Sequence, residues 1–215
     1  MQKSILGDDS LVFKFILVGD TGVGKSSILM KYCDDTFLLE HNVTVGVDFR
    51  SKNVQIDPKT NVKLQIWDTA GQETFGTIVR SFYKDCAAIF LVYDVNSRGT
   101  FQNLETWLSE VRTHCDNEPI YILIGNQVDF NVERQVPYEE GKKFMEDCNL
   151  DFFFETSARN GQNIQKAFSE AIKMVYSHQQ HEKTQSIVNN RKDLSKKKGS
   201  KLSNISQPSR SGGCC

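Results

Sequence analysis

Three glycines, a lysine and a serine occur at fixed spacing in the segment Gly19-Asp20-Thr21-Gly22-Val23-Gly24-Lys25-Ser26. Glycine lets a tight loop turn its backbone amides toward phosphate oxygens, and a following helix adds the positive end of its dipole. The lysine of such a loop neutralises β- and γ-phosphates, and the serine hydroxyl binds Mg²⁺. A chance glycine-rich turn is the alternative. Because a strand pattern precedes the segment and a helix pattern follows it, we predict a nucleoside triphosphate site, without a choice between ATP and GTP.

A second motif, Trp67-Asp68-Thr69-Ala70-Gly71-Gln72-Glu73, follows an apolar stretch. An aspartate at the end of a strand beside a phosphate loop can reach the magnesium shell, usually through water. Taken alone, the motif could be an ordinary loop. With the phosphate loop upstream, it fits the second half of the same site.

The elements that would position these motifs follow from the hydrophobic pattern. Residues 11–18 are mostly apolar and end at a glycine, and residues 26–32 carry apolar positions on one helical face. Residues 45–49 alternate as in a half-exposed strand, and residues 57–61 supply a turn before the chain returns in residues 62–67. A strand, loop and helix are therefore followed by a hairpin.

Further strands and helices alternate after the hairpin. Apolar segments at 87–93, 120–125 and 152–154 are separated by helical patterns around 101–111 and 144–148, and a last helical pattern covers 164–175. Strands that alternate with helices favour a mainly parallel sheet covered on both faces. The fold class predicted is α/β.

Length and charge divide the chain into a body and a tail. A chain of 215 residues accommodates one well-packed domain and some additional sequence. From Ser177 onward, eight Lys or Arg residues and two acids give a charge of +6, so residues 1–176 carry −7 of the total of −1. The apolar period ends at Ser177, and a tail of this composition cannot bury enough surface to fold alone. We predict a flexible N-terminus at 1–10, a domain at 11–176 and a disordered, hypervariable tail at 177–215.

The pattern of apolar runs predicts a cytosolic location, where disulfides are not expected. No apolar run approaches the roughly 20 residues of a membrane-spanning helix, and no signal-type segment begins the chain. Four cysteines stand singly, without metal-ligand spacing, and are interpreted as small buried apolar residues: Cys33, Cys86, Cys115 and Cys148.

Three more segments carry a resemblance to a known family: Val45-Gly46-Val47-Asp48-Phe49, Lys63 to Trp67, and Glu155-Thr156-Ser157-Ala158. In order with the two motifs above, they make the chain resemble the small GTPases of the Ras superfamily, and within it the Rab branch. The resemblance covers about residues 10–176 and the terminal cysteines. It implies a single P-loop G domain, with a six-stranded, mainly parallel sheet and helices on both faces.

The resemblance also implies the site residues. Thr44 would give its hydroxyl to Mg²⁺ and its amide to the γ-phosphate, to which Gly71 would also donate. Gln72 would be the catalytic residue that orients the attacking water, and Phe37 would lie edge-on to guanine. Alone, Phe37 could be core and Thr44 a strand-edge hydroxyl. The full set implied for GTP or GDP is Asp20, Thr21, Gly22, Val23, Gly24, Lys25, Ser26, Ser27, Phe37, Thr44, Gly71, Asn126, Gln127, Asp129, Ser157, Ala158 and Arg159, and for the metal Ser26, Thr44 and Asp68.

The reaction that the resemblance implies is phosphoryl transfer from GTP to water. No arginine occupies the phosphate loop or residues 67–73. We therefore expect slow intrinsic turnover, about 10⁻⁴ s⁻¹, and a partner arginine that accelerates it by up to roughly 10⁵-fold. Hydrolysis would release the segments around Thr44 and Gly71 that the γ-phosphate and Mg²⁺ had ordered.

The chain departs from the family at the base side. The family has Asn-Lys-x-Asp, and this chain has Asn126-Gln127-Val128-Asp129. The Asp129 carboxylate can still accept hydrogen bonds from the two N–H groups of guanine, which adenine cannot offer. Gln127 is shorter than lysine and uncharged, so we expect nucleotide retention weaker by about 1–2 kcal/mol. Arg159 could stack on the base in compensation, or serve only as a surface residue.

The second switch departs as well. Residues 74–77 and 81–85 only loosely resemble the Rab pattern, which has an arginine near Thr74 and a tyrosine at Phe82. Phe49, Trp67 and Phe82 match an aromatic cluster that Rab proteins present to effectors, although three aromatics are more often core. Partner choice is therefore open.

The terminal residues imply a lipid anchor. Cys214 and Cys215 follow two glycines and resemble a Rab-type prenylation signal. Two lipid chains suffice for stable anchoring, and Lys196, Lys197, Lys198 and Lys201 would add attraction to anionic lipid. The alternative is a solvated charge run with a metal-reactive end. We expect a protein that cycles between the cytosol and an internal membrane.

The implied partners are an exchange factor, a GTPase-activating protein, a GDP-dissociation inhibitor, a prenylation escort protein and effectors at the switch regions, without nucleic acid. The rival hypothesis is a nucleotide-binding scaffold with negligible hydrolysis, against which Gln72 argues. An ATP-dependent enzyme conflicts with Asn126 and Asp129.

Overall fold

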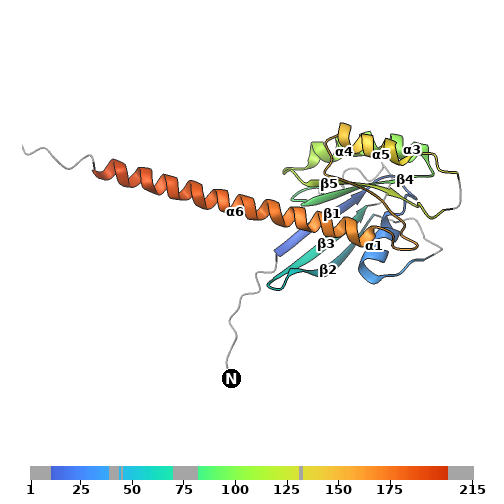
Figure 1. Ribbon diagram of the computed structural model, residues 1–215, viewed down its shortest axis with the longest axis horizontal. Helices are drawn as coiled ribbons and strands as arrows, with labels where there is room; N and C mark the ends of the chain where they lie inside the picture. Colours follow the sequence, from blue (N-terminus) through green and yellow to red (C-terminus); the bar gives the residue numbers. More distant parts are fainter. Residues whose placement is uncertain (1–10, 39–43, 45, 70–81, 131–132, 203–215) are drawn as a thin grey trace, which may run out of the picture. The chain divides into compact units, whose positions relative to one another are not determined.

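The computed structural model describes residues 11–38, 44, 46–69, 82–130 and 133–202, with side chains as far as residue 185. The chain divides into two compact units, at residues 1–175 and at residues 176–215. The first unit contains the sheet (Figure 1).

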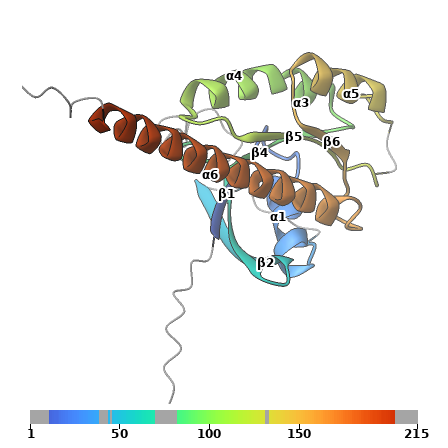
Figure 2. The ribbon, with the colours of Figure 1, turned by 60° about the vertical axis from the view of Figure 1, so that its left-hand side comes forward.

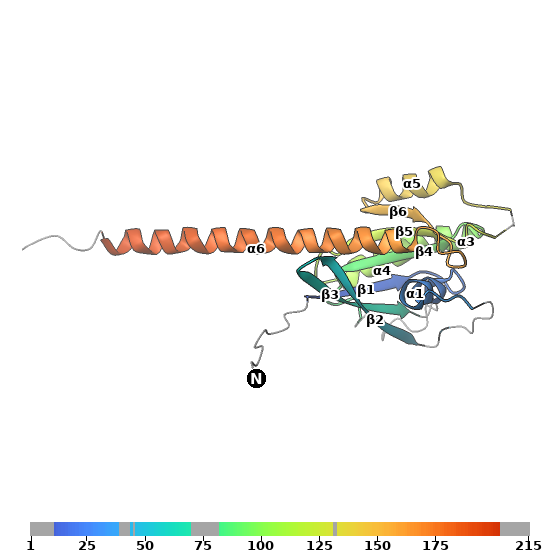
Figure 3. The same cartoon turned by 60° about the horizontal axis from the view of Figure 1, so that its bottom comes forward.

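A six-stranded sheet forms the centre of the first unit, with the strand order β2-β3-β1-β4-β5-β6. Only the β2–β3 pair is antiparallel, and the other pairs are parallel. Figure 3 shows the sheet from β6 near the top to β2 near the bottom. The strands are β1 Leu11–Val18, β2 Val47–Asp57, β3 Thr60–Thr69, β4 Ala88–Asp94, β5 Ile120–Asn126 and β6 Phe152–Glu155. The predicted six-stranded, mainly parallel sheet is confirmed.

The hairpin turn lies where the sequence predicts it. Strand β2 ends at Asp57 and β3 begins at Thr60. The Asp57 carboxylate accepts a hydrogen bond of 2.8 Å from the Lys59 amide, the local side-chain bond that makes aspartate favourable in turns. This turn fixes the register that aligns Asp48 with Asp68 across the two strands.

Helices cover both faces of the sheet, as Figures 1 and 2 show: α3, α4 and α5 lie on one face, and α1 and the first part of α6 on the other. Their bounds are α1 Lys25–Asp34, α3 Arg98–Gln102, α4 Leu104–His114, α5 Tyr138–Asp147 and α6 Ile164–Leu202. On the α6 side, the Phe168 ring stacks on Tyr32 at 3.8 Å between centroids and on Phe90 at 4.6 Å. These rings fix α1 and α6 against β4.

The disorder expected from Ser177 onward stays a prediction. The sequence predicted disorder from this residue, and the structure places residues 177–202 in the continuation of α6. Residues 180–185 are exposed. Glutamine, glutamate and lysine are good helix formers, and no proline interrupts residues 177–202, so the segment keeps helical geometry without an apolar face to bury. No described helix combines the length and the apolar character that crossing a membrane requires.

The four single cysteines are only partly as predicted. Cys86 is fully buried, whereas Cys33, Cys115 and Cys148 are half-buried. All four are free thiols.

Candidate functional site

The phosphate loop connects the buried end of β1 to the start of α1, as the sequence predicted. Gly19 has a φ of +141°, and a Cβ there would lie 2.1 Å from the carbonyl oxygen of Val92 in β4. Gly24 has a φ of +92°, and its Cβ would lie 2.4 Å from Nδ2 of Asn126. Because the loop lies this close to its neighbours, only glycine fits at these two positions.

Lys25 lies under the loop and is 6% exposed. Its Nζ donates to the carbonyl oxygens of Gly19 and Asp20, both at 2.8 Å. Burial lowers the pKa of Lys25 from 10.5 to about 8, although the nearby Asp68 and Asp20 carboxylates raise it. A buried ammonium is costly unless an opposite charge lies beside it, and a bound phosphate would supply that charge.

Three oxygen-bearing side chains converge at the N-terminus of α1. The hydroxyls of Ser26 and Thr44 are hydrogen-bonded at 2.8 Å, and the Ser26 hydroxyl also donates to the carboxylate of Asp68. Asp68 is completely buried at the end of β3. Hydroxyl and carboxylate oxygens suit Mg²⁺, which takes few protein ligands and completes its shell with water and phosphate. The predicted metal residues therefore lie together and fit the ion.

Asn126 joins the base side of the site to the phosphate loop. Its side-chain Nδ2 donates to the carbonyl oxygen of Val23 at 2.9 Å, and its Oδ1 accepts a bond of 3.0 Å from the Thr156 hydroxyl. Asn126 is 1% exposed. Asn126, at the end of β5, therefore connects the loop after β6 to the phosphate loop by hydrogen bonds.

Gln127 reaches the phosphate loop despite its short side chain. Its Nε2 donates to the carbonyl oxygen of Gly22 at 2.8 Å. The backbone of Gln127 has a φ of +69°, and its carbonyl oxygen accepts a bond of 3.0 Å from Asn96. Gln127 therefore braces the phosphate loop from the base side, through a bond that is neutral and exposed.

A cavity of about 170 Å³ opens between the phosphate loop and the loop after β5. Its lining is Gly22, Gly24, Ser27, Phe37, Leu38, Asn126, Gln127, Asp129, Phe130, Ala158 and Arg159. Nine of these were predicted, and Leu38 and Phe130 were not. Both are large apolar side chains with about half of their surface exposed, 54% and 49%. Phe130 directly follows Asp129, so its position was the available signal.

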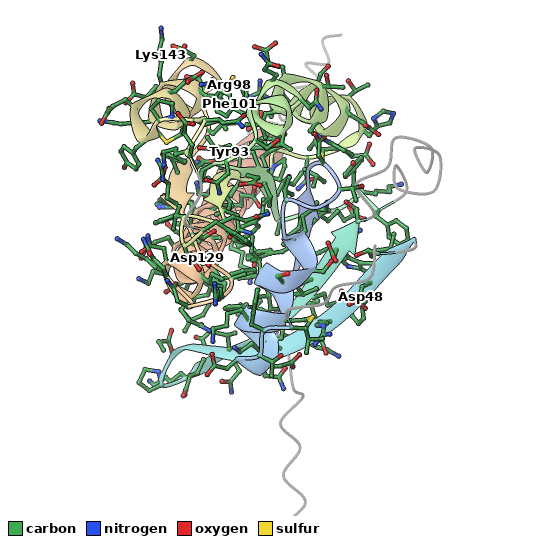
Figure 4. The ribbon with its side chains drawn as sticks, turned by 90° about the vertical axis from the view of Figure 1, so that its right-hand side faces the viewer. Asp48, Tyr93, Arg98, Phe101, Asp129 and Lys143 are labelled. Atoms are coloured by element: carbon green, nitrogen blue, oxygen red, sulfur yellow. The ribbon has the colours of Figure 1, made fainter. Side chains whose placement is uncertain are left out.

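The Asp129 carboxylate lies in this cavity with one oxygen buried. Oδ2 has no hydrogen-bond partner within the described part of the chain. A buried acceptor without a donor is costly, so this atom is suited to a ligand that brings N–H groups. Figure 4 shows Asp129 and Asp48 on opposite sides of α1.

The loop after β6 supports the cavity. Ser157 is buried, and its hydroxyl accepts a bond of 3.2 Å from the Asn160 amide, while its own amide donates to Gln162 at 3.3 Å. Ala158 is 4% exposed. Arg159 lines the cavity and is exposed, which agrees with either of its two expected roles.

The side chain of Asp20 lies toward α4. Its carboxylate binds Asn103 and Trp107, next to and within α4, instead of turning into the loop. Thr21 is exposed. Four further predicted residues lie outside the described residues: Gly71, Gln72, Cys214 and Cys215.

The three aromatics singled out in the sequence form a continuous cluster. Phe49 and Trp67 have ring centroids 4.7 Å apart, and Trp67 and Phe82 4.8 Å apart. Phe49 is 44% exposed. The cluster is therefore partly a surface feature and not simply core.

Comparison with protein families identifies a match over most of the chain. The sequence model of the Ras family matches residues 14–177, which includes all six strands except the first residues of β1.

Proposed function

The chain belongs to the Ras family, and from this premise we propose that it is a Rab-like GTPase, a slow GTP-hydrolysing switch that recruits effectors to a membrane in vesicular trafficking. Ras-family GTPases bind GTP, GDP and Mg²⁺, and work with exchange factors, activating proteins and effectors. The finer assignment rests on the features described below.

The buried oxygen Oδ2 of Asp129, which has no hydrogen-bond partner among the described residues, is the observation that supports guanine most directly. Guanine presents two adjacent N–H groups on one edge, and a carboxylate can accept both. Adenine would leave this charge buried without a donor, which disfavours ATP. The cavity beside the phosphate loop has apolar walls at Phe37, Leu38 and Phe130, against which a purine ring can pack.

At the phosphate end, the residues of the chain would act mainly by position and charge. Lys25 would turn from its two carbonyl partners toward the β- and γ-phosphates, while the loop amides donate to the same oxygens. Ser26 and Thr44 would hold Mg²⁺ directly and Asp68 through water; the ion, when bound, neutralises charge between the β- and γ-phosphates. Gln72 would orient the attacking water, as the family resemblance implies.

The switch follows from Thr44. Among the described residues, its hydroxyl is bonded to Ser26, which in turn donates to Asp68. Loss of the γ-phosphate would remove the second support that the Thr44 amide has in the GTP state, so the segment around it would be released. The effector surface would be the cluster of Phe49, Trp67 and Phe82.

The Rab-like part of the proposal is supported by this cluster and by the terminal cysteines. Prenylation of Cys214 and Cys215 would anchor the protein to the cytosolic face of an internal membrane, with an escort protein and a GDP-dissociation inhibitor as partners. Intact-mass measurement after expression in eukaryotic cells tests this. Two added prenyl masses support it, and a Cys214→Ser, Cys215→Ser variant is the control.

The nucleotide claim is tested by extraction of the purified, bacterially expressed protein. We expect GDP or GTP at about one molecule per chain; ATP, ADP or no nucleotide would overturn the proposal. Single-turnover hydrolysis of GTP by the wild type and Gln72→Leu then separates an enzyme from a scaffold. We expect hydrolysis to be at least about tenfold slower in the variant, whereas equal rates favour the scaffold hypothesis.

A further inference from the structure

The second residue of the phosphate loop is a carboxylate that points away from the phosphate position. Asp20 Oδ2 accepts a hydrogen bond from Nδ2 of Asn103, and Oδ1 accepts one from Nε1 of Trp107, both at 2.7 Å. Both carboxylate oxygens are therefore bound, by donors more than 80 residues away in the sequence. Short bonds to an ionised acceptor are among the stronger hydrogen bonds in proteins.

A carboxylate in this loop has two electrostatic consequences. Turned inward, it would repel the phosphates and compete with them for Lys25. Held outward, it leaves its backbone carbonyl oxygen aligned with Nζ of Lys25, at 2.8 Å. The two donors from the α4 region thus determine whether Asp20 opposes or supports phosphate binding.

The donors are themselves fixed. Trp107 is 7% exposed and belongs to the same buried cluster as Val18, the last residue of β1 before the loop. Asn103 directly precedes α4, and its amide is bonded to the carbonyl oxygen of Gly99 at 3.1 Å. Apolar packing and two hydrogen bonds therefore join α4 to the phosphate loop.

We propose that Asp20 is a positioning residue that Asn103 and Trp107 hold away from the nucleotide, so that α4 controls how firmly the phosphate loop retains GDP. The inference rests on the proposed nucleotide binding and adds a route of regulation to it. A displacement of α4 would loosen Asp20 and speed GDP release without any contact to the nucleotide.

The test removes and then reverses the hydrogen bond between Asn103 and Asp20, using asparagine and aspartate because the two side chains have the same shape. Asn103→Asp places a carboxylate opposite Asp20, and the two repel. We expect GDP dissociation about tenfold faster, the range for a lost hydrogen bond to a charged group. Combining Asn103→Asp with Asp20→Asn restores a donor and an acceptor in the opposite direction, and we expect dissociation within about threefold of the wild type.

Gln102→Glu is the matched control, because it adds the same charge at the neighbouring exposed position. It should leave GDP dissociation unchanged. The inference is overturned if Asn103→Asp releases GDP at the wild-type rate, if Gln102→Glu accelerates release equally, or if the double variant does not recover.

A second readout needs no nucleotide. In the nucleotide-free protein, amide hydrogen exchange in residues 19–25 should rise in Asn103→Asp and return in the double variant. Unchanged exchange contradicts the inference. Nucleotide extraction from the wild type tests the proposed function separately. A failure of the proposed nucleotide binding can therefore be distinguished from a failure of the role inferred for Asp20.

Discussion

The phosphate end and the base end of the site are built by different means. At the phosphate end, backbone geometry determines the site, through glycines at positive φ and carbonyl oxygens that hold Lys25. At the base end, side chains determine it: Gln127 and Phe130 line the same cavity as the Asp129 carboxylate. A backbone site tolerates few residue types, whereas a side-chain site can be rebuilt with other residues of similar reach. The difference predicts that substitutions at the two ends fail in different ways.

The largest effect is expected from Gly19→Ala at the phosphate end. The new methyl group would lie 2.1 Å from the carbonyl oxygen of Val92, so β1 and β4 must separate. We expect a loss of at least ~3 kcal/mol in the free energy of unfolding, measured by urea denaturation. Gly22→Ala is the control: its φ of +84° is also positive, but nothing lies within 4 Å of the new atom. It should cost only about 1–2 kcal/mol. Equal losses would show that φ alone, and not close approach, demands glycine.

Asp129→Asn tests whether the base end can be altered without loss of the fold. GDP affinity should fall by about 2 kcal/mol, roughly 30-fold, because a charged acceptor becomes a neutral amide. The free energy of unfolding of the nucleotide-free protein should not decrease, because Oδ2 has no partner among the described residues that the change would remove. Titration with labelled GDP and urea denaturation measure the two quantities. A parallel loss of affinity and stability would contradict the separation of the two ends.

The same contrast explains what the sequence could predict. Glycine spacing, the lysine and the strand patterns depend on local chain geometry, so the loop at 19–26, the six strands and the position of Asp68 could be predicted from residue order. Family resemblance added Thr44, and the structure brings its hydroxyl to Ser26. These features repeat whenever the same backbone must bind phosphate.

Other features depend on distant contacts and could not be predicted in this way. The direction of the Asp20 side chain is set by Trp107, 87 positions along the chain. Leu38 and Phe130 join one cavity only after folding. Residues 177–202 combine good helix formers with a composition typical of disorder, so residue order alone does not decide between the two; the structure assigns them to α6.

The pH dependence of binding probes the phosphate end through Lys25. Its pKa is lowered to about 8, so in the nucleotide-free protein the ammonium loses its proton above this pH. Phosphate binding needs the charged form, and affinity for GDP should fall about tenfold between about pH 7 and about pH 9. Stability changes in the opposite direction: the unfolded lysine binds its proton up to about its ordinary pKa of 10.5, so the nucleotide-free protein gains stability between these two pKa values as pH rises.

Fluorescence titration of GDP across this range measures the affinity, and Lys25→Met removes the titrating group. The variant should bind weakly, with little dependence on pH over the same interval. If wild type and variant show the same pH dependence, another group controls the effect, and the buried lysine is not the source of phosphate affinity at this end.

The smallest effect on GDP dissociation is expected from substitutions of Gln127, which connects the two ends of the site. The bond from Gln127 to the Gly22 carbonyl oxygen joins the base end to the phosphate end, but this bond is neutral and exposed. Its loss in Gln127→Ala should therefore speed GDP dissociation about fivefold, which corresponds to about 1 kcal/mol. Gln127→Lys should slow dissociation by a similar factor, because a charged donor to the same carbonyl is stronger than an amide. The sequence predicted weaker nucleotide retention because lysine is absent. Since Gln127 still bonds to the Gly22 carbonyl oxygen, the expected loss is only the difference between a charged and a neutral hydrogen bond. Stopped-flow measurement of GDP release compares the wild type and the two variants on one scale. Equal rates for lysine and glutamine would mean that the apolar wall of Phe37, Leu38 and Phe130, and not the brace, limits how long the base is retained.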